Sequence, residues 1–337
     1  MRSTVRRFAT ALVLGSLVVG CGAGGSNGAG ATATPAADAT SGTAGPGACT
    51  AAPSPPDKQE GWTSAAKAPT VFPVIVNSSG SLTCGQNRLL FTFLDAENRP
   101  VAKPDRTASI TLFNLGRDGA KSTNQVDGTF VWGIENERGF YIANVTFPEA
   151  GRWGAEFATA AAGAALETIR MTFDVATSSP VVRLGDRAPA SETPTAASVG
   201  GDLSRISTDP HPDPAFYATS VKAALAAHQP FVLIFATPKF CTSAQCGPTL
   251  DRVKPIAAQF PTVAFMHVEP YEMTFQNGAL QAALDAQGQL QATKIVADWG
   301  LLSEPWVFVV DRNGIVTASF EGVVSVDEVT AAANAVK

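Results

Sequence analysis

The sequence predicts two folded domains, an antiparallel β-sandwich followed by an α/β domain. Three features support this: seven short apolar or alternating runs between residues 70 and 175, a Pro-rich break from 177 to 212, and an unbroken apolar stretch, Phe231–Phe235. Alternating runs between turn residues indicate antiparallel strands, whereas an unbroken short run indicates a buried central strand. The 337 residues, 45% of them hydrophobic, provide enough chain for both domains.

Residues 1–20 are typical of a secretory signal peptide. Basic residues near Arg2 precede an apolar segment, Phe8–Val19, that is too short to span a bilayer. Cys21 follows directly after small residues, an arrangement that resembles the bacterial lipobox. The resemblance implies cleavage before Cys21, lipid on its sulfur and a location on the extracytoplasmic face of the cell membrane. An ordinary secretory signal is the alternative.

Residues 21–60 are predicted to form a flexible tether because Gly, Ala, Thr, Ser and Pro dominate them. Four cysteines remain besides Cys21, an even number for an oxidising compartment. The economical pairing is Cys49 with Cys84 and Cys241 with Cys246. The first pair is expected to be a structural disulfide that pins the end of the tether, because neither of its cysteines opens a helix.

Residues 61–176 are predicted to form the β-sandwich. Its expected strands are 72–76, 87–95, 109–114, 129–134, 140–147, 154–158 and 168–175. Turn signals such as Asp118–Gly119 separate them. The stretch from Gly139 to Trp153 resembles a strand, turn and next strand of bacterial immunoglobulin-like domains. An immunoglobulin-like binding or spacer module is therefore expected.

The Pro-rich linker at 177–212 leads into the predicted α/β domain at 213–337. The expected elements are a helix from Asp213–Pro214, strand 231–235, a helix opening between 244 and 247, strand 263–268, a helix from 274 to about 296, strands 306–310 and 315–320, and a last helix opened by the capping box Ser325–Glu328.

Two cysteines lie where the buried strand gives way to a helix. Pro248 is tolerated only in a first helical turn, which leaves Cys241 on the incoming loop and Cys246 at the helix start. Helix N–H groups lower the pKa of a thiol at that position, and the thiolate is the reactive form of cysteine. A redox-active pair is expected, with an inert stapling disulfide as the alternative.

The order of these elements resembles the thioredoxin-like fold over about residues 205–337. The segment FATPKFC followed by CGP looks like the FWAxWCGPC neighbourhood of thioredoxins, but the spacing is C-x4-C and Thr249 stands where a second cysteine is usual. The resemblance implies thiol–disulfide exchange, without a cofactor, with protein partners outside the cytoplasm. Cys241 would attack and Cys246 would resolve the mixed disulfide; the reverse assignment stays open because Cys246 lies nearer the helix dipole.

The same resemblance gives roles to three further residues. Pro305 precedes a strand in the place of the cis-proline of thioredoxin-like folds, and is expected to be cis. Together with its neighbour Glu304 it would bind the backbone of a substrate. Phe240 would shield the cysteines in the place of the thioredoxin tryptophan.

Copper delivery, peroxide reduction and a non-catalytic role are the alternatives to thiol–disulfide exchange. The longer spacing also resembles Sco-type copper-delivery proteins and implies Cu(I) on two thiolates, but Ser303–Pro305 lacks the histidine those proteins add. His267, on an apolar strand, is expected to be a core residue. Peroxide reduction ranks third because Thr237 lies one residue too far from Cys241. A non-catalytic binding or scaffold lipoprotein also remains. The net charge of −5, without a basic patch, argues against nucleic-acid binding.

Overall fold

The structure is a computed structural model that describes residues 49–55, 61–62, 69–119, 121–123 and 125–337. The predicted signal peptide, the lipidation site Cys21 and most of the predicted tether lie outside the described residues. Residues from Gly47 onward belong to one compact unit. Within the part of the chain that is described, no helix combines the length and the apolar character needed to cross a bilayer.

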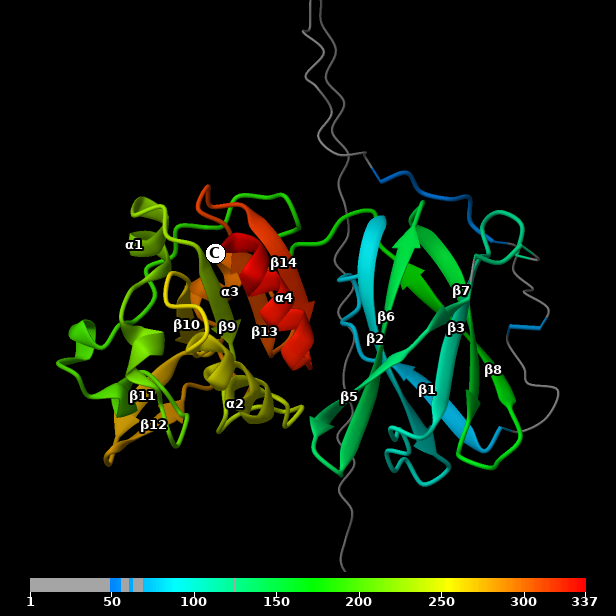
Figure 1. The fold of residues 1–337 in the computed structure, drawn as a ribbon, viewed down its shortest axis with the longest axis horizontal. Helices are drawn as coiled ribbons and strands as arrows, with labels where there is room; N and C mark the ends of the chain where they lie inside the picture. Colours follow the sequence, from blue (N-terminus) through cyan, green and yellow to red (C-terminus); the bar gives the residue numbers. More distant parts are fainter. Residues whose placement is uncertain (1–48, 56–60, 63–68, 120, 124) are drawn as a thin grey trace, which may run out of the picture. The chain divides into compact units, whose positions relative to one another are not determined.

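Residues 71–175 form two four-stranded antiparallel sheets (Figure 1), with strand orders β1-β2-β6-β5 and β4-β3-β7-β8. The strands are β1 (Val71–Ile75), β2 (Gly85–Asp95), β3 (Thr107–Asn114), β4 (Val126–Asp127), β5 (Thr129–Ile134), β6 (Arg138–Phe147), β7 (Gly151–Ala160) and β8 (Glu167–Val175). The predicted β-rich character of this region is confirmed. The short β4 is an addition to the strands expected from sequence.

The two sheets share one core. Aromatic side chains dominate it, and Phe91, Tyr141, Phe147, Trp153 and Phe157 are each at most 1% exposed. Their rings meet at centroid distances such as 5.1 Å for both Phe91–Phe157 and Phe147–Trp153. Large aromatic rings remove much apolar surface from water, so their burial between the sheets stabilises the sandwich.

The Cys49–Cys84 pair forms a disulfide with a Cα–Cα distance of 5.4 Å. Beside it, the Ala52 N–H donates to the Ala150 carbonyl at 2.8 Å. The described end of the predicted tether is therefore fixed to the β-sheets.

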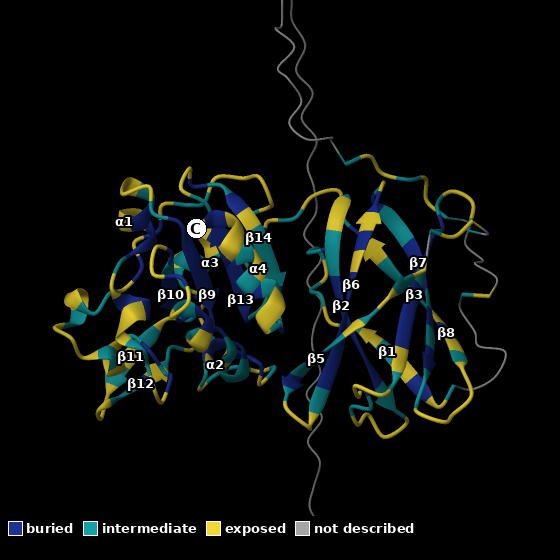
Figure 2. Ribbon diagram, viewed as in Figure 1, coloured by how far each residue is buried: buried dark blue, intermediate teal, exposed yellow. Residues whose placement is uncertain are grey.

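The C-terminal region contains a mixed four-stranded sheet in the order β10-β9-β13-β14. Its strands are β9 (Phe231–Phe235), β10 (Ala264–Val268), β13 (Trp306–Val310) and β14 (Val316–Glu321). The central strand β9 runs parallel to β10 and antiparallel to β13. Every residue of β9 and β13 is buried (Figure 2), as the unbroken apolar runs predict.

Helices pack on both faces of this sheet. The helices are α1 (Val221–Ala226), α2 (Cys246–Ala257), α3 (Lys294–Trp299) and α4 (Val326–Val336). Val232 and Val307 share a core with α2 and α4, whereas the alternate residues Leu233 and Phe308 share a second core with α1 and α3. Strand side chains point to opposite faces in turn, so each central strand contributes to both cores. The predicted Ser325–Glu328 capping box opens α4.

The prediction of a helix from residue 274 to about 296 is wrong. This stretch instead contains a hairpin of β11 (Met273–Gln276) and β12 (Ala279–Ala282), and only α3 is helical. Asn277 and Gly278 at the hairpin tip have φ angles of 52° and 78°. Asn-Gly is the preferred pair for a two-residue hairpin turn that needs positive φ at both positions, and it outweighs the helical spacing around it.

The Pro-rich linker packs against the C-terminal sheet. Val181 is buried, the Val182 N–H donates to the Trp299 carbonyl at 3.1 Å, and the Ala188 N–H donates to the Gly314 carbonyl at 2.9 Å. Short 3-10 turns follow at η1 (Ala197–Val199), η2 (Leu203–Arg205) and η3 (Pro214–Tyr217). The linker is therefore an ordered cover of the sheet.

Side chains of β2 and β6 contact the C-terminal region. The Arg88 guanidinium binds both oxygens of Glu328 in α4 and donates to the Val323 carbonyl. Leu90, Phe140 and Val323 belong to one buried apolar cluster. These contacts place a charged network and an apolar patch between the two parts of the fold.

Candidate functional site

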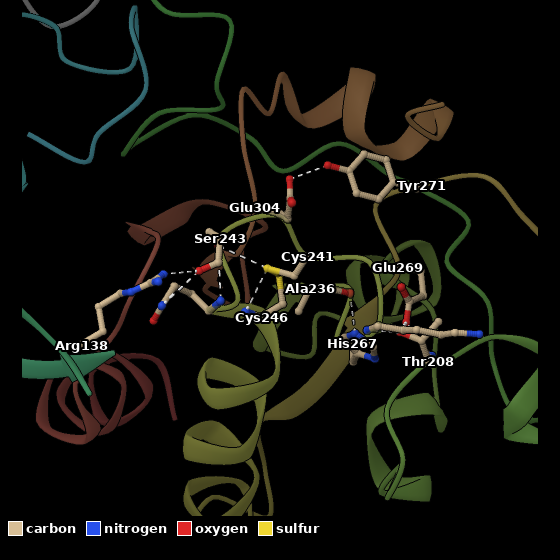
Figure 3. Close-up of a disulfide and its surroundings, with 12 residues drawn as sticks. Arg138, Thr208, Ala236, Cys241, Ser243, Cys246, His267, Glu269, Tyr271 and Glu304 are labelled. Atoms are coloured by element: carbon tan, nitrogen blue, oxygen red, sulfur yellow. Dashed lines mark hydrogen bonds between the residues drawn. A yellow bond between two sulfur atoms is a disulfide. The ribbon is translucent and has the colours of Figure 1, made fainter. Parts of the chain in front are cut away.

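The Cys241–Cys246 pair forms a disulfide at the start of α2, with a Cα–Cα distance of 6.0 Å. The loop after β9 folds back so that Cys241 approaches the helix end (Figure 3). Gln245, the residue before the helix, makes no side-chain capping hydrogen bond. Instead the Cys246 N–H donates to the Cys241 sulfur at 3.3 Å. The sulfur of Cys241 thus partly replaces the missing helix cap.

The two cysteines differ in burial. Cys246 is 0% exposed and belongs to the core beneath α2, whereas Cys241 is half-buried at the edge of that core. The Ser243 hydroxyl lies 3.2 Å from the Cys241 sulfur. A thiolate at Cys241 would therefore have two neighbouring donors, a helix N–H and a hydroxyl, and would be reachable from outside.

Glu304 and Pro305 lie beside the disulfide, directly before β13. The Glu304–Pro305 peptide bond is cis, as predicted. One carboxylate oxygen of Glu304 lies within 4.8 Å of both sulfurs. The structure therefore brings together four of the predicted site residues, the two cysteines and this dipeptide.

Tyr271, at the carboxyl end of β10, holds the Glu304 side chain. Its hydroxyl donates to Glu304 Oε2 at 2.6 Å. Burial raises the pKa of Tyr271, and the hydrogen bond to Glu304 and its negative charge raise the pKa further. Tyr271 consequently remains a hydrogen-bond donor throughout the neutral range (Figure 3).

Phe240 precedes Cys241 in the loop and is half-buried. Its ring makes a cation–π contact with Lys239, whose Nζ lies 5.1 Å from the ring centroid. The predicted shielding role of Phe240 stays a prediction.

His267 lies below the loop with both ring nitrogens engaged. Nδ1 is 2.7 Å from the Tyr217 hydroxyl, Nε2 is 2.9 Å from the Ala236 carbonyl oxygen, and the residue is 2% exposed. Each ring nitrogen therefore has a hydrogen-bond partner inside the fold. His267 is thus a core residue, as expected, and has no free nitrogen for a metal.

The hairpin between β5 and β6 reaches the cysteine loop from the N-terminal sheets. Arg138 Nη1 donates to the Ser243 carbonyl at 2.9 Å (Figure 3). Gln245 is buried against Gly133, where an added Cβ would overlap the Gln245 side-chain oxygen. The hairpin therefore supports the conformation of the loop that carries Cys241.

A cavity of about 370 Å³ lies beside the loop. Its apolar wall includes Val76, Leu90 and Phe140 from the N-terminal sheets, and its polar wall includes Ser243, Glu304 and Glu321. A space with both kinds of wall next to the disulfide provides room for a side chain of a bound partner.

Sequence reasoning missed Tyr271, Ser243, Gln245 and Arg138. Tyr271 had a usable signal, because it follows a strand that is parallel to the strand before Cys241, and the carboxyl ends of parallel strands share one sheet edge. For Arg138 the sequence offers no such signal, because more than a hundred residues separate it from its contact, Ser243.

The two cysteines and Glu304 are close enough to be tested as a metal site, and they fit Cu(I) poorly. Their donor set contains a hard carboxylate oxygen, and no histidine belongs to it among the described residues. Cu(I) favours soft thiolate and thioether ligands. We therefore do not assign this cluster as a metal centre.

Comparisons with known proteins give little further information. No family model and no curated protein matches the chain. A solved structure of a DUF4426 family protein from Pseudomonas aeruginosa PAO1 aligns at 14% identity over 31% of this chain and 87% of its own, with a TM-score of 0.23. A similarity at that level carries no argument about this protein.

Proposed function

We propose that the protein is a thiol–disulfide oxidoreductase that acts on protein thiols or disulfides outside the cytoplasm through Cys241 and Cys246. In this proposal, lipid on Cys21 tethers it to the extracytoplasmic face of the cell membrane. Residues 213–337 would be thioredoxin-like and residues 61–176 an immunoglobulin-like sandwich. The sheet order β10-β9-β13-β14, with helices on both faces, supports the first assignment.

One observation carries the proposal: a disulfide at the first turn of α2 that joins one half-buried and one fully buried cysteine. An exchange-active pair needs one sulfur that a partner protein can reach. It also needs a second sulfur that attacks the first one within the same chain. A bridge that only staples the loop needs neither the helix N-terminus nor the difference in exposure.

The reaction proceeds in two steps in the reducing direction. The Cys241 thiolate attacks a partner disulfide, forms a mixed disulfide and releases one partner thiolate. The Cys246 thiolate then attacks the Cys241 sulfur, which forms Cys241–Cys246 and releases the second partner thiolate. The two protein thiols are oxidised and one partner disulfide is reduced; the oxidising direction is the reverse.

The reduction potential of the pair tests this proposal. The mature chain, with Cys21→Ser to prevent lipidation, is equilibrated in a graded glutathione series, alkylated and analysed by mass spectrometry. A reversible couple between about −120 and −270 mV is expected. A bridge that stays oxidised below about −300 mV would contradict exchange and favour a structural scaffold.

Copper binding to the same reduced sample separates the remaining alternative. Tight Cu(I) binding that requires both cysteines, together with a potential outside the exchange range, would point to a copper carrier. Trapping of partners with Cys246→Ser, which stops the reaction at the mixed disulfide, then identifies the substrates.

A further inference from the structure

The two oxygens of the Glu304 carboxylate have different surroundings. Oε2 accepts the hydrogen bond from Tyr271 at 2.6 Å. Oε1 is buried and has no hydrogen-bond partner among the described residues. A buried acceptor without a donor is destabilising, and more so when it is charged, so this carboxylate oxygen calls for an explanation.

The two cysteines beside Glu304 can supply a hydrogen-bond donor once the disulfide is reduced. The Glu304 carboxylate lies within 4.8 Å of both sulfurs, and the disulfide has no S–H group to offer. Reduction creates two thiols beside the carboxylate. Cys241 is half-buried and can exchange its proton with solvent, but Cys246 is 0% exposed and cannot do so directly. The thiol that most needs a proton acceptor is therefore Cys246.

We propose that Glu304 accepts the proton of the Cys246 thiol when Cys246 resolves the mixed disulfide, and that Tyr271 positions the carboxylate for this transfer. The inference rests on the proposed exchange function and adds a catalytic residue to it. No other described carboxylate lies as close to the two sulfurs, and the sequence resemblance gives Glu304 only a role in substrate binding.

The step balances as follows. The proton moves from Cys246 Sγ to the Glu304 carboxylate, and the resulting thiolate attacks the sulfur of Cys241 in the mixed disulfide. The S–S bond to the partner breaks as the Cys241–Cys246 bond forms. The electron pair leaves with the partner sulfur, which takes the proton from Glu304 and departs as a thiol. Glu304 is again a carboxylate.

The surroundings of the carboxylate suit this role. The N-terminus of α2 stabilises a thiolate at Cys246 through the helix dipole, which favours loss of the proton. The other titratable group on the cavity wall besides Tyr271 is Glu321 of β14. Glu321 Oε1 already accepts hydrogen bonds from the Ser78 N–H and the Ser303 hydroxyl. The nearest described guanidinium to the loop, Arg138, is bound to the Ser243 carbonyl.

The test separates the two steps with glutathione disulfide as the probe. Reduced full-length mature protein is mixed with the probe, quenched with acid and analysed by mass spectrometry for the mixed disulfide on Cys241 and for the closed Cys241–Cys246 bridge. The variants are Glu304→Gln, Glu304→Asp and Tyr271→Phe. Glu272→Gln, an exposed carboxylate next to Tyr271, is the matched control.

Glu304→Gln is expected to slow the second step at least tenfold at pH 7 and to make the mixed disulfide accumulate. In a Cys246→Ser background the same substitution should change the rate of the first step much less than it changes the rate of the second step in the protein with both cysteines. The loss of rate in the second step should shrink as pH rises, because a higher pH populates the Cys246 thiolate without Glu304. A purely structural loss would not recover with pH. Glu304→Asp should restore part of the rate, Tyr271→Phe should be intermediate, and Glu272→Gln should match the wild type.

The outcomes distinguish this inference from the proposed function. If the wild type forms no mixed disulfide and no closed bridge, the exchange function fails and the inference with it. If the wild type exchanges normally and Glu304→Gln closes the bridge at the same rate, or slows both steps equally, only the role of Glu304 is overturned. Formation of the Cys241–Cys246 disulfide in every variant that keeps both cysteines, checked after oxidation, shows that the site has folded.

Discussion

The two disulfides of this chain lie in different surroundings. Cys49–Cys84 closes a sequence separation of 35 residues and ties an incoming segment to the β-sheets. Cys241–Cys246 closes a separation of only 5 residues at a helix N-terminus, next to a hydroxyl and a carboxylate. The helix N-terminus and the hydroxyl beside the second pair stabilise a thiolate, whereas neither cysteine of the first pair begins a helix.

The difference shows that the environment of a disulfide, rather than its presence, indicates its role. A long closed loop restricts the unfolded chain strongly and gives stability. A short closed loop restricts the unfolded chain less, so a disulfide across only a few residues contributes less stability. A role in thiol–disulfide exchange therefore explains the second bridge better than a structural role does. The following predictions test this difference between the two bridges.

The largest expected effect is on exchange activity. Cys241→Ser should reduce thiol–disulfide exchange to the uncatalysed background, because it removes the attacking thiolate. The Cys49→Ser/Cys84→Ser double variant should retain most of the activity if it is assayed below its unfolding temperature. Reduction of a model disulfide peptide, followed by chromatography, measures both. Equal losses in the two variants would remove the functional difference between the bridges.

The two disulfides should contribute to stability in the opposite order to their contributions to activity. Loss of the Cys49–Cys84 bridge should lower the free energy of unfolding by about 4 kcal/mol, and loss of the Cys241–Cys246 bridge by about 2 kcal/mol, because the cost grows with the length of the closed loop. Urea unfolding of the two Ser/Ser double variants measures both values. A larger loss from the short loop would show that the second bridge has a structural role after all.

The Arg88–Glu328 pair tests whether the two regions that contain the bridges are coupled. Arg88→Met should lower the free energy of unfolding by about 3 kcal/mol at pH 7, because it leaves a largely buried carboxylate without its cation. Urea unfolding measures the loss. Arg99→Met, which removes an exposed ion pair with Asp95, is the control and should change stability little.

The effect of Arg88→Met should depend on pH. Burial acts to raise the pKa of Glu328, but hydrogen bonds and charge from Arg88 outweigh it, and the net pKa lies below the ordinary value of 4.5. The stability that this carboxylate contributes is therefore present above about pH 4.5 and is lost as pH falls through the lowered pKa. The wild type and the variant should converge in acid, and a constant difference down to pH 3 would contradict this account.

The smallest expected effect concerns Ser243. Ser243→Ala removes the hydroxyl beside the Cys241 sulfur and should slow the first exchange step about three- to fivefold, in line with the loss of one modest hydrogen bond. Thr242→Ala, an exposed neighbour in the same loop, is the control. Formation of the mixed disulfide in a Cys246→Ser background measures the step. An unchanged rate would show that the hydroxyl does not stabilise the thiolate.

Local patterns predicted parts of the fold, although the helix expected from Asp213–Pro214 is a 3-10 turn, Pro214–Tyr217, followed by the separate helix α1. The apolar runs of β9 and β13, the first turn marked by Pro248 and the Ser325–Glu328 capping box each depend on neighbouring residues, and each matches the structure. The expected helix after residue 274 failed because its spacing outweighed the Asn277–Gly278 turn in the prediction.

The site was predictable only in part. Cys241, Cys246 and the Glu304–Pro305 dipeptide were named from motif and order. Tyr271, Ser243 and Arg138 were not, because their contacts depend on how loops and strands meet in space. The position of the Glu304 carboxylate near the sulfurs required the folded chain, since more than fifty residues separate it from Cys246.

The capping box of α4 has a consequence for modularity. Glu328 accepts the Ser325 N–H that starts the helix and also the guanidinium of Arg88, which belongs to β2. Val323, just before the helix, is buried together with Leu90 of the same strand. A chain cut after the Pro-rich linker would expose this apolar patch and leave the carboxylate uncompensated. The C-terminal sheet is therefore not a portable unit that can be transplanted without its N-terminal neighbour.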